Sequence, residues 1–269
     1  MFRSENFFEA KKRLFAMSIL KVSDVNFSYG GLLVLENLSF AVNPGEKVAL
    51  IGPNGAGKST LLNILSGLLY PKSGRVYLSD KDISQLPPHR RVSLGIGRSF
   101  QKSALFSGLN VLNNVLIALK GVERSRYQMT KPLDSSRSCV AQAEELLKKV
   151  KLWPKRGLQV EILSHGEKRQ LEIVLSLACR PKVLLLDEPS AGLTSGESVE
   201  VVELIRGLME DTAVLFAAHD LDLVYELSDR VLVLYYGHIL AQGTPEEIQN
   251  DPKVQEIYLG TEAKVARTD

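Results

Sequence analysis

Gly52-Pro-Asn-Gly-Ala-Gly-Lys-Ser59 is the stretch of this 269-residue chain that decides its fold. It fits the pattern G-x-x-x-x-G-K-[ST], in which glycines let the backbone curl so that successive N–H groups point at bound phosphates. A short apolar run, residues 48–51, precedes it, and an apolar stretch with helical spacing, residues 61–68, follows it. A strand, a phosphate-binding loop and a helix in that order predict a site for ATP or GTP.

Two side chains of this loop have specific expected roles. Lys58 is expected to reach the β- and γ-phosphates, and the hydroxyl of Ser59 is expected to bind Mg²⁺. A glycine-rich turn without chemistry is the alternative, and the flanking strand and helix disfavour it. The predicted nucleotide-binding residues of this region are Gly52, Pro53, Asn54, Gly55, Ala56, Gly57, Lys58, Ser59 and Thr60.

The composition is that of an ordinary globular protein, with 45% hydrophobic and 24% charged residues. A net charge of +2 is too small to predict a nucleic-acid partner. Cys139 and Cys179 lie far apart without C-x-x-C or metal-binding spacing, as expected of reduced thiols in a cytosolic protein. The sequence has no apolar run approaching the ~20 residues of a membrane span.

The first sixteen residues combine several phenylalanines with Lys11, Lys12 and Arg13 but lack a continuous apolar core, so they do not resemble a secretory signal. They fit either a basic amphipathic helix on a membrane surface or an extension ahead of a start at Met17. We expect residues 1–17 to be an extension, because the patterned sequence begins only at Ile19.

From residue 183 onward, strands and helices alternate along the chain. This alternation predicts an α/β fold with a mostly parallel sheet covered by helices. The expected strands are residues 20–27, 35–42, 75–78, 95–100, 183–186, 213–218 and 231–235, and the expected helices are residues 111–119, 139–152, 198–209 and 221–227.

Two carboxylates, Asp187 and Glu188, follow the apolar run of residues 183–186. They are expected at the carboxyl end of a buried strand, where open α/β sheets bind ligands. Asp187 would hold Mg²⁺, and Glu188 would orient and deprotonate the attacking water. The alternative is a surface acidic pair that closes a strand.

Three further sites are candidates for contact with a nucleotide. Ser164 and Glu167 fit a capping box, S-x-x-E, and a capped helix start with a glycine can also bind a γ-phosphate. His219 follows residues 213–218 and could contact the γ-phosphate and the attacking water. Gln101 follows residues 95–100, and its amide could reach Mg²⁺ and water. A well-capped helix and a structural histidine remain alternatives.

In chain order, the phosphate loop, Gln101, the LSHGE run, the LLLDEP run and His219 resemble the ATP-binding subunit of an ABC transporter, over residues 19–260. The resemblance implies that Tyr29 stacks on adenine. It also identifies Ser190-Ala-Gly-Leu-Thr194 as the D-loop, with Thr194 in place of the commoner Asp. In the signature, His165 stands where Gly is usual and Glu167 where Gln is frequent, whereas Ser164 and Gly166 are kept.

Four short stretches are similar to one branch of that family, the importers of branched-chain and other hydrophobic amino acids. They are Gly95-Ile-Gly-Arg-Ser-Phe-Gln101, Leu171-Glu-Ile173, Ala191-Gly-Leu193 and Ile257-Tyr-Leu-Gly260. Importers of urea and short amides share much of the pattern, so the substrate stays open.

The resemblance implies a RecA-like P-loop core with an antiparallel β-subdomain and a helical insertion at about residues 102–162. The cassette would span residues 18–260, with a tail at 261–269. Two such subunits would enclose two ATP molecules. The implied catalytic residues are Lys58, Glu188 and His219, the implied metal ligands are Ser59, Gln101 and Asp187, and the implied signature residues acting on the partner's ATP are Ser164, His165, Gly166 and Glu167.

The same resemblance implies the protein's partners and place. It implies a second ATPase subunit, two membrane permease subunits at the cytoplasmic face of the inner membrane and, indirectly, an extracytoplasmic solute-binding protein. Two rival classes remain. Non-transport ABC ATPases of DNA repair or translation usually have two cassettes or long coiled coils, whereas this chain has one cassette and no sustained heptads. A P-loop kinase would explain neither the LSHGE run nor His219.

Overall fold

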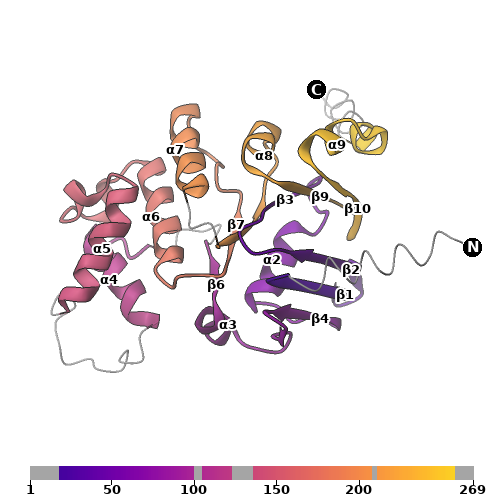
Figure 1. Ribbon diagram of the computed structural model, residues 1–269, viewed down its shortest axis with the longest axis horizontal. Helices are drawn as coiled ribbons and strands as arrows, with labels where there is room; N and C mark the ends of the chain where they lie inside the picture. Colours follow the sequence, from indigo (N-terminus) through magenta and orange to yellow (C-terminus); the bar gives the residue numbers. More distant parts are fainter. Residues whose placement is uncertain (1–17, 100–104, 123–135, 208–210, 258–269) are drawn as a thin grey trace, which may run out of the picture.

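The computed structural model describes residues 18–99, 105–122, 136–207 and 211–257 (Figure 1). Within them the strands form two sheets, one with the order β2-β1-β4-β5 and one with the order β10-β9-β3-β8-β7-β6. The first sheet is antiparallel and consists of β1 (Leu20–Tyr29), β2 (Leu32–Val42), β4 (Ser73–Leu78) and β5 (Lys81–Asp82).

The second sheet is parallel except for β10, which pairs antiparallel with β9. Its strands are β3 (Lys47–Ile51), β6 (Ile96–Arg98), β7 (Val183–Asp187), β8 (Ala213–Ala217), β9 (Arg230–Tyr235) and β10 (His238–Gly243). All five residues of β7 and of β8 are buried, which explains their continuous apolar sequences. The predicted α/β class is therefore confirmed.

Helices cover both faces of the parallel sheet, and alternate residues of one strand belong to different cores. Val48 and Leu50 of β3 join the core shared with the antiparallel sheet, whereas Ala49 and Ile51 join the core on the other face. The helices are α2 (Lys58–Ser66), α3 (Pro88–Leu94), α4 (Val111–Val122), α5 (Arg137–Lys149), α6 (His165–Leu177), α7 (Ser195–Arg206), α8 (Leu221–Leu227) and α9 (Pro245–Gln249), with short 3-10 turns at Trp153–Lys155 and Val160–Ile162.

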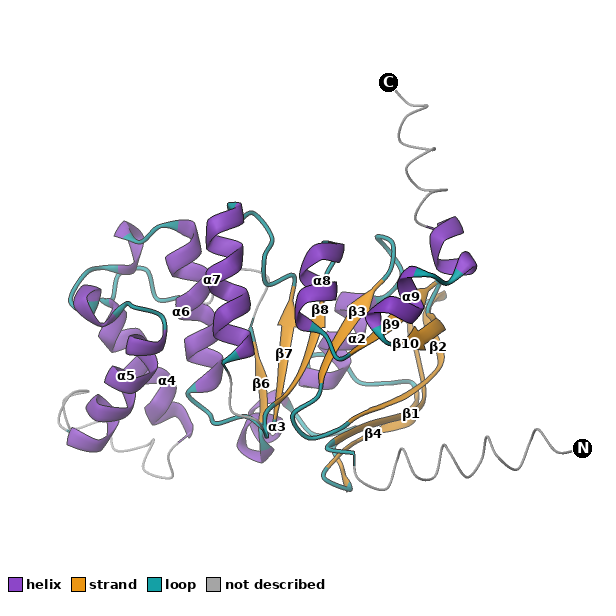
Figure 2. Cartoon of the chain, turned by 45° about the horizontal axis from the view of Figure 1, so that its top comes forward, coloured by secondary structure: helices purple, strands orange, loops and turns teal. Residues whose placement is uncertain are grey.

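Helices α4 and α5 lie at the opposite end of the molecule from β1, β2 and β4, and α6 and α7 lie between them and the rest of the parallel sheet (Figures 1 and 2). This arrangement places α6, which carries the LSHGE run, beside the strands that end in the predicted nucleotide site. None of the described helices is long and apolar enough to cross a bilayer.

The predicted bounds of α4, α5 and α7 differ from the observed ones by two or three residues, and two of these differences have a clear local reason. Helix α7 begins at Ser195 rather than residue 198, because Thr194 and Glu197 form a capping box ahead of the first apolar residue. Helix α5 ends at Lys149 rather than residue 152, because Lys151 takes a left-handed φ of 56°. Helices α3 and α9 and the edge strand β10 were not predicted. The end of the strand expected at 95–100 lies outside the described residues.

Neither cysteine takes part in a disulfide. Cys139 is fully buried in the core beneath α5. Burial raises the pKa of the Cys179 thiol to about 11. Neither thiol is therefore a ready nucleophile or metal ligand at neutral pH.

Candidate nucleotide-binding and catalytic site

The ends of three parallel strands lie level, which brings the predicted site residues together. Ala217 at the end of β8 pairs with Leu50 of β3 on one side and with Asp187 of β7 on the other. The backbone N–H of Glu188 donates to the Ala217 carbonyl at 2.9 Å, so the pairing continues past β7. The phosphate loop, the two carboxylates and His219 therefore share one edge of the sheet, as ligand sites of open α/β sheets do.

The phosphate loop is pressed against its neighbours so closely that two of its glycines have no room for a side chain. Gly52 has a φ of 147°, and a Cβ there would lie 2.0 Å from the Leu234 carbonyl oxygen of β9. Gly57 has a φ of 107°, and its Cβ would lie 2.7 Å from Cδ2 of Leu35 in β2. These contacts hold the loop in the curled conformation that directs its N–H groups inward.

The start of α2 offers an anion site. Its N-cap is Gly57, and in the described structure no side chain accepts from its first N–H groups. The ammonium of Lys58 is buried and donates to the carbonyls of Gly52 at 2.5 Å and Pro53 at 3.1 Å. Burial lowers the pKa of Lys58, and Glu188 and Asp187 oppose this effect. A bound phosphate would place further negative charge beside this cation.

Ser59 and Asp187 provide oxygen ligands of the kind that Mg²⁺ prefers. The Ser59 hydroxyl lies 3.4 Å from Oδ1 of Asp187, whose side chain is only 3% exposed. Burial raises the pKa of Asp187, and the nearby Arg98 opposes this rise. Among the described residues no three His, Cys, Asp or Glu side chains form a metal cluster. Nucleotide-bound Mg²⁺ does not need one, because phosphates and water supply most of its ligands. The residues present therefore fit the ion.

Arg98 is a residue of this site that the sequence reasoning missed. Its guanidinium donates to the Leu62 carbonyl at 3.1 Å and to the Ser66 hydroxyl at 2.6 Å, and it lies 3.8 Å from Oδ2 of Asp187. It thus connects β6 with α2 and with the carboxylate. The only hint in the sequence was a positively charged residue at the end of a short apolar strand. The partners of Arg98 in α2 and β7 are distant in the sequence and could not be predicted from it.

Glu188 and His219 face each other at the open side of the site. Nδ1 of His219 lies 3.7 Å from Oε1 of Glu188, and the two side chains are 62% and 27% exposed, respectively. Both can therefore reach a water molecule. Glu188 has a φ of 49°, a left-handed conformation that non-glycine residues seldom adopt and that surrounding contacts must maintain.

Arg169, in the second turn of α6, supplies such contacts. Its guanidinium donates to the carbonyls of Asp187 at 2.7 Å, Glu188 at 3.0 Å and Pro189 at 3.1 Å. It also pairs with Glu172 at 3.0 Å. The sequence reasoning missed Arg169, since nothing in a helical sequence shows which distant turn a buried arginine contacts.

The signature run begins α6 as predicted. Ser164 is the N-cap and forms the capping box with Glu167, which also pairs with Lys155. An unpredicted contact comes from α7: Oε1 of Glu197 accepts from the Gly166 backbone N–H at 3.0 Å and from the Ser164 hydroxyl at 3.3 Å. The spacing from Thr194 to Glu197 fits a capping box, so the sequence could have predicted that Glu197 lies in the first turn of a helix.

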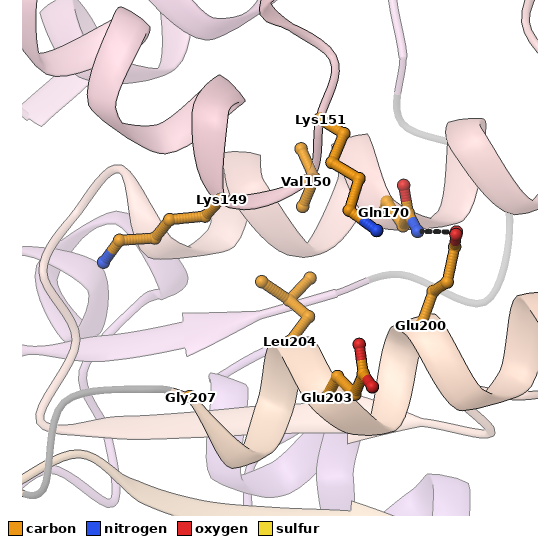
Figure 3. Close-up of a pocket in the computed structure, with 8 residues that line it drawn as sticks. All are labelled: Lys149, Val150, Lys151, Gln170, Glu200, Glu203, Leu204 and Gly207. Carbon is orange, nitrogen blue, oxygen red and sulfur yellow. Dashed lines mark hydrogen bonds between the residues drawn. The ribbon is translucent and has the colours of Figure 1, made fainter.

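Gln170, the neighbour of Arg169, attaches α6 to α7. Its amide donates to the Glu200 carboxylate at 2.7 Å, at a cavity of about 310 Å³ between α5, α6 and α7 (Figure 3). The Lys151 ammonium points toward the same pair (Figure 3). Helix α6 is therefore fixed both to α7, through Gln170, and to the turn after β7, through Arg169.

Two predicted nucleotide contacts lie apart from this network. Tyr29 ends β1 with 49% of its surface exposed and packs edge-on against Phe27, with ring centroids 4.8 Å apart. This exposure leaves the Tyr29 side chain accessible to a ligand. Gln101 lies outside the described residues.

A phosphate loop, two carboxylates at the end of the next-but-one strand and a capped signature helix on an α/β core together define an ATP-binding cassette. Two family sequence patterns match the chain: "ABC transporter" over residues 35–191, and "Branched-chain amino acid ATP-binding cassette transporter" over residues 238–264. The chain belongs to the ATP-binding proteins of ABC transporters, within the branched-chain amino-acid branch that includes LivG and BraF.

Three relatives illustrate the match. The high-affinity branched-chain amino acid transport ATP-binding protein LivG of Escherichia coli is 37% identical over 249 residues, covering 90% of this chain and 98% of LivG. BraF of Pseudomonas aeruginosa, described in the same words, is 35% identical over 254 residues, with 90% and 98% covered. LptB of Acidithiobacillus ferridurans, a lipopolysaccharide export ATP-binding protein, is 34% identical over 248 residues, with 92% and 99% covered.

Solved structures of ATP-binding cassettes have the same fold as this chain. A nucleotide-free ATP-binding cassette from an ABC transporter superposes with a TM-score of 0.81 at 33% identity, covering 90% of this chain and 99% of that one. The dimeric cassette MJ0796 superposes with a TM-score of 0.73 at 26% identity, covering 84% and 98%. The chain is therefore an ABC transporter ATPase, and cassettes of this kind occur as dimers.

Proposed function

We propose that this ATPase drives import of branched-chain or other hydrophobic amino acids and that it hydrolyses ATP at sites composed of two subunits. The substrate assignment is supported by the match at residues 238–264 and by the names of LivG and BraF. LptB is nearly as similar, so export of a lipid-like molecule is the second candidate. Urea and short amides are further alternatives, because the motifs quoted for the branch are shared.

The ATPase mechanism rests on one observation: Lys58, Asp187 and Glu188 lie together at the same edge of the parallel sheet. The loop N–H groups and Lys58 bind the phosphates, and Tyr29 stacks on the base. Ser59, Asp187 and Gln101 would hold Mg²⁺, which would neutralise phosphate charge when bound. Glu188 accepts a proton from the attacking water, and His219, 3.7 Å away, orients the water and the γ-phosphate.

The signature run acts on the ATP of a second subunit. Helix α2 already presents its uncapped N-terminus to the phosphates of its own subunit. The N-terminus of α6, with Ser164, His165, Gly166 and Glu167, would bind the partner's γ-phosphate. The partner is a second copy or a paralogue. Two permease subunits at the cytoplasmic face of the inner membrane, served by a solute-binding protein outside, complete the proposed transporter.

The composite site is tested by size-exclusion chromatography of a Glu188→Gln protein with Mg-ATP, with and without Ser164→Arg. The arginine places bulk and charge at the contact between subunits and leaves the phosphate loop of its own subunit intact. We expect ATP-dependent dimers from Glu188→Gln and ATP-bound monomers from the double variant. Dimers from both proteins, or from neither when the natural partner subunit is supplied, would contradict the composite site.

The substrate is tested by uptake of labelled leucine into cells that lack this chain. Uptake should return with the wild-type chain and remain absent with Glu188→Gln, because transport needs hydrolysis. Restored lipid export or urea uptake without leucine uptake would favour one of the alternatives.

A further inference from the structure

One carboxylate of the free subunit occupies the place where the signature would bind an anion. Glu197 lies in the first turn of α7, and its Oε1 accepts from the Gly166 backbone N–H at 3.0 Å and from the Ser164 hydroxyl at 3.3 Å. These are a backbone donor and a side-chain donor at the N-terminus of α6, the set that a phosphate oxygen would use there.

We infer that Glu197 holds the signature's anion site in the free subunit and thereby sets the ATP concentration at which two subunits close on their nucleotides. The inference rests on the composite site proposed above. In this view the carboxylate and the partner's γ-phosphate compete for the same two donors. A site held by the carboxylate 90% of the time would bind the partner's nucleotide about tenfold more weakly than an open one.

The hydrogen bonds of Glu197 allow a phosphate to displace its carboxylate from the signature. Hydrogen bonds from Thr194 foremost, and from Gly166, lower the pKa of Glu197, so the group is anionic at neutral pH. The two oxygens have different partners: Oε2 accepts from the Thr194 backbone N–H at 3.1 Å and from its hydroxyl at 3.0 Å. The contact of Oε1 with the signature can therefore break while the capping box of α7 remains.

Gly166 makes the close approach possible. A Cβ built at Gly166 would lie 2.5 Å from Oε1 of Glu197, so a side chain there would displace the carboxylate. Because Gly166 has no side chain, the Glu197 carboxylate can approach its backbone N–H in the free subunit. The same open space is left for a phosphate oxygen in the dimer.

The experiment measures the Mg-ATP concentration for half-maximal dimerisation in a Glu188→Gln background. Glu197→Gln keeps the side-chain length and an amide oxygen for the Thr194 capping box but removes the competing negative charge. Glu247→Gln is the matched control, because Glu247 forms the same capping box with Thr244 at the start of α9. We expect the half-maximal concentration to fall about 3- to 10-fold with Glu197→Gln and to stay unchanged with Glu247→Gln.

The outcomes separate this inference from the function on which it rests. If the Glu188→Gln parent stays monomeric at saturating ATP with its natural partner supplied, the composite site is wrong and the inference falls with it. If the parent dimerises but Glu197→Gln needs the same or more ATP, Glu197 does not compete with the nucleotide and the inference alone is overturned. A thermal denaturation curve for each variant verifies that it is folded.

Discussion

At the scale of single residues, Asp187 and Glu188 are adjacent carboxylates with different surroundings. Asp187 is 3% exposed and lies beside Ser59 and Arg98, whereas Glu188 is turned toward His219 and solvent. Burial with hydroxyl and guanidinium neighbours suits a metal ligand, and access to water suits a general base. Asp187 is the last residue of β7, and Glu188 follows it with a left-handed φ of 49°.

Glu188→Gln should therefore keep ATP binding and lower turnover by about 10²–10⁴-fold, the range for losing a positioned base. Binding is measured with a fluorescent ATP analogue, and turnover by phosphate release from the purified protein. Glu172→Gln would be a poor control because Glu172 pairs with Arg169, so the exposed Glu226→Gln serves instead and should retain turnover. Near-normal hydrolysis by Glu188→Gln would place the base elsewhere.

The residues identified from the sequence are those whose neighbours along the chain reveal their setting. Gly52 to Ser59 and Asp187-Glu188 follow apolar strands, and Ser164 and Glu167 satisfy a four-residue spacing rule. Arg98, Arg169 and Glu197 were missed, because each is defined by contacts with segments distant in the sequence, and no local spacing reports such contacts.

At the scale of elements, α6 links two parts of the site. Its first turn carries Ser164 and Gly166, and its second turn carries Arg169, which donates to three carbonyls around Glu188. Any shift of α6 on meeting a partner's nucleotide would act on the backbone that holds the base. The predicted boundaries failed at elements whose ends depend on capping rather than on apolar periodicity, as at α7, or that carry little periodicity, as at α3.

Arg169→Lys should lower turnover by about 10- to 100-fold with little change in the KM for ATP, because a lysine cannot donate to three carbonyls at once and a misplaced base reacts slowly. Arg230→Lys is the control: Arg230 is a partly buried arginine paired with Glu46 at 2.7 Å, and it lies at the start of β9, whereas the site lies at the carboxyl ends of the parallel strands. The control should lower the melting temperature without lowering turnover. In a Glu188→Gln background Arg169→Lys should cause no further loss, and an additive loss would contradict a positioning role.

At the scale of the whole molecule, the nucleotide site joins both sheets and both cores. The phosphate loop contacts β2 through Gly57 and β9 through Gly52, so a bound nucleotide stabilises contacts between segments far apart in the chain. The α/β class and the order of strands and helices could be predicted from apolar patterning, because buried parallel strands leave a continuous signal. The order of strands within each sheet could not, since pairing partners leave no trace in a single sequence.

Mg-ADP should therefore raise the melting temperature of the isolated subunit. At about 100 times its Kd a ligand adds about 2.7 kcal/mol to the free energy of unfolding. At ~2–4 °C per kcal/mol for a chain of this size, the shift is about 5–10 °C. Lys58→Ala should abolish the shift, whereas Lys148→Ala, on the exposed face of α5, should retain it. A full shift in Lys58→Ala would remove Lys58 from phosphate binding.

The burial of the two thiols has a practical consequence for labelling chemistry. Because burial raises the pKa of Cys179 to about 11, very little of this thiol is ionised at pH 7. Cys139 is enclosed in the core and out of reach of alkylating reagents. The wild-type chain is thus nearly silent toward maleimides, and a reporter thiol introduced at Ser164 would react almost alone. Its protection by Mg-ATP in a Glu188→Gln protein would follow subunit closure in real time, without first removing the native cysteines.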